Sequence, residues 1–144
     1  AGTQVYQKSS QIVEAVAKGH VALGIVNHYY IYRHLAAQPA APIAAIMPDQ
    51  QEGGMGAIMN VTGIGITRTS KHVDSAKLLV EFLVAQAGQK LFADLDKEYP
   101  LHPDVKADPA LVDRHSFRAA LVPLARLAEL RESTLTLIEQ VGLR

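Results

Sequence analysis

Cysteine is missing from the chain, and neither sign of charge is in excess. Without cysteine, a disulfide scaffold and any metal site built on thiolates are excluded. Fourteen basic residues balance fourteen acidic ones, so the formal net charge is zero. Nucleic acid and acidic membrane surfaces are therefore not expected partners, because no basic field exists to attract them. No apolar run has the length of a membrane span, so membrane insertion is not expected.

Motifs of the common catalytic sites are also missing. The sequence has no Gly-x-Ser-x-Gly turn and no His-Glu-x-x-His helix, so an enzyme is not expected. What the chain does have is length and apolar content. Its 144 residues are 49% hydrophobic, which is enough for one domain with a real core.

The order of predicted elements favours an α/β fold. Good capping residues at Ser9 and Ser10, then a helical apolar pattern and Gly19, predict a helix over residues 10–18. The apolar run 20–26 is typical of a buried strand, and residues from His28 to Leu35 read as a helix. Later segments predict a second strand at 57–67, core-facing helices near 78–83 and 88–96, and final helices at 122–130 and 132–141.

The segment from Asn27 to His34 concentrates metal-binding side chains. It contains three of the five tyrosines and two of the six histidines. A phenol with a pKa near 10 costs about 4 kcal/mol to deprotonate at pH 7, so two adjacent phenolates form only where a positive charge stabilises them. A hard, highly charged cation provides that charge, and oxygen donors suit such ions. Tyr29 and Tyr30 are therefore candidate ligands of a trivalent ion such as Fe(III).

The two tyrosines can share an ion only if the chain turns at this point. In a continuing strand they would face opposite sides. Asn27 is a suitable cap for a helix that begins there, and Arg33 would then lie one turn after both tyrosines. Its guanidinium could steady a phenolate or hold an accompanying anion. The alternative is a packing pair at the edge of a core, with its hydroxyls reaching water.

These residues also carry a family resemblance. The run from Gly24 to Arg33 resembles the tandem-tyrosine signature of periplasmic ferric-ion-binding proteins, the substrate-binding subunits of bacterial Fe(III) ABC importers. The resemblance covers nearly the whole chain. Further segments in the family's order are Val13–Gly19 before this run, and Met59–Ile66, Ser70–His72 and Glu98–Leu101 after it.

The resemblance implies a periplasmic-binding-protein-like (type II) architecture with two lobes, of which this chain resembles the C-terminal portion. Residues 1–59 and 111–144 would form the C-terminal lobe with the tyrosines, and residues 60–110 would belong to the N-terminal lobe, with hinges near 59–60 and 110. The expected partners are an ABC permease and the N-terminal half of the same protein. The expected location is the periplasm, or a lipoprotein anchor outside the cytoplasmic membrane.

The resemblance also implies site roles. Tyr29 and Tyr30 would bind Fe(III) as phenolates, with a synergistic anion such as carbonate or phosphate. Asn27 and Arg33 are candidates for supporting or anion contacts, as is Ser9, which stands where the family often has an asparagine. As a plain helix cap Ser9 needs no ligand. Two alternatives remain: the same fold binding an oxyanion or small organic anion, and an interaction domain without a ligand.

Overall fold

The computed structural model describes residues 2–143 and divides them into two compact units. The first unit contains residues 2–26, 46–60 and 117–143. The second contains residues 27–45 and 61–116. Segment 27–45, which carries the tandem tyrosines, thus groups with 61–116. These ranges differ from the lobes expected from the family resemblance, whose assignment stays a prediction.

Helix α1 (Ser9–Ala17) belongs to the first unit and confirms the predicted helix, displaced by one residue. Its N-cap is Lys8, whose backbone N–H donates to Gln11 Oε1 at 3.1 Å. The expectation that Ser9 caps the helix is therefore wrong, because Ser9 already has helical backbone geometry. Gly19 ends the helix with a φ of +72°, a left-handed conformation that glycine adopts without strain.

The predicted strands at 20–26 and 57–67 are not formed among the described residues. A strand needs a neighbour for its ladder of hydrogen bonds, and residues 20–26 have none. Leu23 and Ile25 are 77% and 97% exposed. The described residues show β pairing only as an isolated parallel bridge between Ala57 and Ala119. The α/β class consequently stays a prediction.

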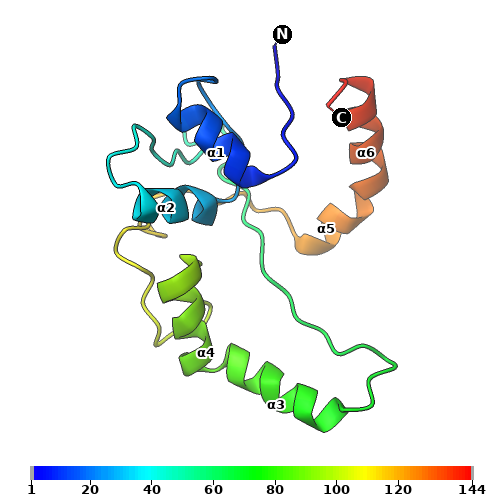
Figure 1. Cartoon of the computed structure of the whole chain (residues 1–144). Helices are drawn as coiled ribbons and strands as arrows, with labels where there is room; N and C mark the ends of the chain where they lie inside the picture. The colour runs from blue at the N-terminus through cyan, green and yellow to red at the C-terminus, as the bar shows by residue number, and fades with distance from the viewer. Residues whose placement is uncertain (1, 144) are drawn as a thin grey trace. The chain divides into compact units, whose positions relative to one another are not determined.

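Two further helices complete the first unit, α5 (Leu124–Glu129) and α6 (Arg131–Gln140), as predicted. In the second unit, α2 (His28–Ala37) is followed by α3 (Val73–Val84), α4 (Gln86–Leu91) and the π-helical turn η1 (Phe92–Asp96). Figure 1 shows α3 and α4 as consecutive helices separated by a sharp corner.

Gly88 is required at that corner. It is buried, and a Cβ at this position would lie 2.3 Å from the Phe82 carbonyl oxygen and 2.6 Å from Leu83 Cα. The neighbouring Gln89 side chain donates to the Leu83 carbonyl at 3.1 Å and accepts the Leu101 N–H at 2.9 Å. The corner therefore also fixes the extended segment that follows η1.

The apolar face of α3 is not buried, which corrects the prediction of a core-facing helix. Leu78 is 67% exposed and Phe82 is 46% exposed, and α3 has no buried residue. Buried apolar side chains among the described residues are few and all lie outside α3: Val13, Ala15, Tyr32, Ala57, Ala93, Leu111 and Phe117. The helical period identified the apolar stripe of α3 correctly, but no part of the chain that the structure describes buries this stripe.

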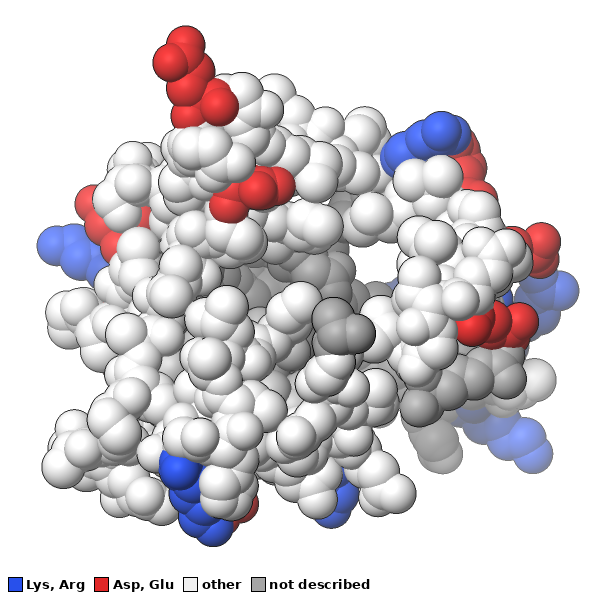
Figure 2. Space-filling model, turned by 90° about the horizontal axis from the view of Figure 1, so that it is seen from above, with Lys and Arg blue, Asp and Glu red and all other residues white. Residues whose placement is uncertain are grey.

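Figure 2 shows one face of the molecule, on which basic and acidic side chains lie in small groups, some of them adjoining, among mostly uncharged residues. Within residues 2–143, no helix combines the length and apolar character needed to cross a membrane.

Candidate tandem-tyrosine site

Tyr29 and Tyr30 lie side by side in the first turn of α2. Their ring centroids are 4.5 Å apart with an interplanar angle of 40°, and both side chains are half-buried. The chain turns into a helix directly before them, as the sequence predicts. The two phenols are therefore adjacent, and solvent or a solvated ion can reach both of them.

Asn27 occupies the N-cap position of α2, but its side chain makes no capping hydrogen bond. Its Nδ2 instead donates to the Tyr29 hydroxyl oxygen at 3.1 Å. The expected side-chain cap is therefore wrong, and the same side chain contacts the candidate ligand directly. A donor at this position favours the phenolate form of Tyr29.

Several groups act on the pKa of Tyr29. The hydrogen bond from Asn27 is the largest influence and lowers the pKa, whereas partial burial, the neighbouring Tyr30 and the negative charge of Glu98 raise it. Together they raise the pKa above the usual value for tyrosine. In the absence of a cation, Tyr29 is therefore protonated at neutral pH.

His28 attaches the start of α2 to the segment after η1. Its Nε2 is 2.7 Å from the Lys97 carbonyl oxygen. Its ring centroid lies 5.8 Å from that of Tyr29 and 5.1 Å from that of Tyr99. These contacts hold residues 97–99 beside the tandem tyrosines.

Two other tyrosines, Tyr99 and Tyr32, contact the backbone of Val112. The Tyr99 hydroxyl donates to the Val112 carbonyl oxygen at 2.6 Å, and the Tyr32 hydroxyl oxygen accepts the Val112 N–H at 3.3 Å. Burial is the largest influence on the pKa of Tyr99 and raises it. Both hydroxyls are thus occupied by the backbone of Val112.

Lys97 supports the same region through a left-handed backbone conformation, with a φ of +59°. Its ammonium group donates to the Asp94 carbonyl oxygen at 2.9 Å and forms a partly buried ion pair with Asp108. That contact, followed by the N–H of Ala110, lowers the pKa of Asp108. The ion pair therefore anchors the turn that presents Glu98.

Two of the predicted supporting residues make no described contact with the tyrosines. Arg33 is exposed, and within residues 2–143 no hydrogen bond or ion pair joins it to either phenol. Ser9 belongs to the first unit, whereas Tyr29 and Tyr30 belong to the second. Anion roles for both residues stay predictions.

His28 and Glu98 are neighbours of the site that the sequence did not single out. Sixty-nine positions separate His28 from the Lys97 carbonyl that it contacts. No local pattern signals a contact across that interval, so only the folded chain reveals it. Glu98 stands in a segment that carries the family resemblance, yet nothing in its spacing marks a role at the tyrosines.

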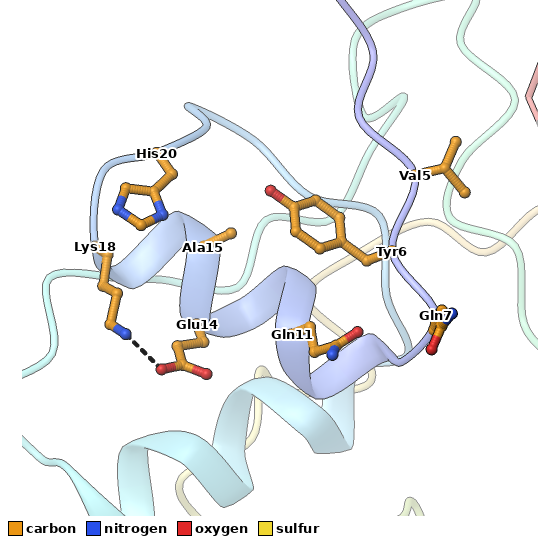
Figure 3. Close-up of a pocket in the computed structure, with 8 residues that line it drawn as sticks. All are labelled: Val5, Tyr6, Gln7, Gln11, Glu14, Ala15, Lys18 and His20. Atoms are coloured by element: carbon orange, nitrogen blue, oxygen red, sulfur yellow. Dashed lines mark hydrogen bonds and ion pairs between the residues drawn. The ribbon is translucent and has the colours of Figure 1, made fainter.

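The two open hollows described on this chain do not contain the tandem tyrosines. One, of about 420 Å³, lies beside α1 in the first unit (Figure 3). There Lys18 Nζ and Glu14 Oε1 form an exposed ion pair at 2.6 Å, so the charges already satisfy each other. The other, of about 480 Å³, follows residues 99–115. In the described part of the chain, no three His, Cys, Asp or Glu side chains gather in a metal-binding group.

Comparison with known protein families decides the class. Residues 1–119 match the family described as bacterial extracellular solute-binding protein. The chain belongs to this family. Such membership supports the predicted periplasmic-binding-protein-like architecture, and the family is named for binding rather than for catalysis. No solved structure matches this solute-binding protein.

Its relatives include proteins named for iron. Iron uptake protein A2 of Synechocystis sp. is 26% identical over 136 residues, which are 90% of this chain and 39% of the relative. The major ferric iron-binding protein of Neisseria meningitidis is 26% identical over 139 residues, 96% of this chain and 42% of the relative. The Fe(3+)-binding periplasmic protein of Serratia marcescens is 26% identical over 125 residues, 85% of this chain and 36% of the relative. The solute-binding chain therefore spans well under half the length of these relatives.

Proposed function

We propose that this chain is part of an extracytoplasmic protein that captures Fe(III) with the phenolates of Tyr29 and Tyr30 and delivers it to an ABC importer. The observation that carries the proposal is the pair of adjacent, solvent-reachable phenols at the start of α2, 4.5 Å apart by their ring centroids. The names of the relatives, which refer to ferric iron and iron uptake, support the choice of ion.

Proton loss from the phenols is the step that selects the ion. At neutral pH each phenol costs about 4 kcal/mol to deprotonate, and the pKa of Tyr29 is raised further. A trivalent cation offsets this cost much better than a divalent one, because the attraction scales with the charge. Hard oxygen donors then favour Fe(III) over softer metals.

Two phenolates leave most coordination positions of Fe(III) open. We propose that a synergistic anion such as carbonate or phosphate occupies some of them. Asn27, Arg33 and Ser9 are the candidates to hold it. An exposed guanidinium such as that of Arg33 suits an anion that arrives with the metal. The remaining ligands would come from the N-terminal half of the protein.

The proposal includes two lobes that close over the ion. Residues 1–59 and 111–144 would form the lobe that carries the tyrosines, residues 60–110 would belong to the other lobe, and the hinges would lie near 59–60 and 110. The uncovered apolar side chains of α3 fit a chain that packs against further protein. Periplasmic location, or a lipoprotein anchor outside the cytoplasmic membrane, and delivery to an ABC permease complete the proposal.

A titration with Fe(III) tests the proposal directly. Phenolate ligands give a visible charge-transfer band, which we expect in the wild-type protein and not in the double variant Tyr29→Phe/Tyr30→Phe. Tyr6→Phe is the matched control, since Tyr6 belongs to the first unit and its hydroxyl donates to Gln4 at 2.6 Å. Saturable binding of phosphate or a small organic anion, with no iron band, would instead support an anion-binding protein. Binding of neither ligand would support an interaction domain.

A further inference from the structure

Glu98 is held next to the tandem tyrosines by contacts on both sides of it. The carbonyl of the preceding residue, Lys97, accepts the hydrogen bond from His28, and the ring of the following residue, Tyr99, packs on the same imidazole. His28 is itself covalently adjacent to Tyr29 and contacts its ring. The backbone of Glu98 is thus confined beside the start of α2.

Among the residues that the structure describes, the carboxylate of Glu98 has no cationic partner. It is half-buried, and the Thr62 hydroxyl donates to its two oxygens at 3.2 and 3.4 Å. No Lys, Arg or His among residues 2–143 forms an ion pair with it. The nearest lysine in sequence, Lys97, is already committed to Asp108. A solvent-reachable carboxylate without a counter-ion is available to bind a hard cation.

We propose that the Glu98 carboxylate is a third iron-binding group of this chain, beside the Tyr29 and Tyr30 phenolates. The inference rests on the proposed function and extends it. One carboxylate and two phenolates carry three negative charges, which match the charge of Fe(III). With a trivalent cation present, all three anions are stabilised together. Thr62 is then the residue that orients the carboxylate.

The test measures Fe(III) affinity by competition with citrate, with the tyrosinate-to-iron band as the signal. Glu98→Gln removes the charge and keeps the size of the side chain, and we expect an affinity loss of about tenfold or more. Glu98→Asp keeps the charge and should retain more affinity than Glu98→Gln. Thr62→Val keeps the carboxylate but removes its hydrogen bond, so its loss should be smaller. Glu81→Gln, on the exposed surface of α3, is the matched control.

Three results would overturn the inference. The first is wild-type affinity in Glu98→Gln. The second is an equal loss in Glu98→Gln, Glu98→Asp and Thr62→Val, because Glu98 would then only position its segment. The third is the absence of any tyrosinate-to-iron band in the wild-type protein, which overturns the proposed function itself. The first two results leave the wild-type band intact, so the two kinds of failure are distinguishable.

Discussion

Replacing Asn27 with alanine isolates the contact that favours the Tyr29 phenolate. The Asn27 amide donates to the Tyr29 oxygen at 3.1 Å and makes no side-chain cap to α2, so its removal should leave the helix intact. A hydrogen bond to a charged group contributes about 1.5–3 kcal/mol. Because this hydrogen bond is the largest influence that lowers the pKa of Tyr29, its removal in Asn27→Ala should raise that pKa.

Ultraviolet difference absorbance during an alkaline titration measures this shift without any metal. The expected result is that one tyrosine ionises at higher pH in Asn27→Ala than in the wild type, while circular dichroism shows unchanged helix content. Gln38→Ala, at the other end of α2, is the matched control, because its exposed amide makes no contact with a phenol. An unchanged titration curve would refute the assigned role of Asn27. A loss of helix would show that Asn27 acts as a cap after all.

Three further predictions concern protons, the α3–α4 corner and the partly buried ion pair. Because a phenol loses its proton when it binds a metal as phenolate, Fe(III) uptake by two such ligands at neutral pH should release about two protons, measured in weakly buffered solution. Release near zero would exclude phenolate ligands. Gly88→Ala should lower the free energy of unfolding by about 1–3 kcal/mol, because the added Cβ would clash with the backbone of Phe82 and Leu83. Gly65→Ala, where a Cβ meets open space, should not change it. Equal denaturation midpoints of the two variants would contradict the clash. Asp108→Asn should lower stability by about 1 kcal/mol at neutral pH. Because the pKa of Asp108 is lowered in the folded state, its contribution is complete above the usual carboxyl pKa near 3.9 and is lost as pH falls below it. The difference between Asp108→Asn and the wild type should therefore shrink on acidification, and a difference independent of pH would contradict the ion pair.

The helices of this chain could be predicted largely from local sequence. The positions of α1, α2, α5 and α6 follow from apolar period and end signals, because a helix satisfies its hydrogen bonds within one segment. Strands do not have this independence. Residues 20–26 have the composition of a buried strand, but strand formation depends on a partner that the described residues do not supply.

The tandem tyrosines, the helix that begins beside them and the family resemblance were determined by the sequence itself, since all three depend on residues close together in the chain. Tertiary structure alone decided what surrounds the phenols. In the folded chain the Asn27 amide donates to the Tyr29 hydroxyl and does not cap the helix. The contact between His28 and the Lys97 carbonyl places Glu98 beside the two tyrosines. Contacts between segments so far apart follow from packing of the folded chain, and the pairing of two particular distant residues leaves no local pattern in the sequence.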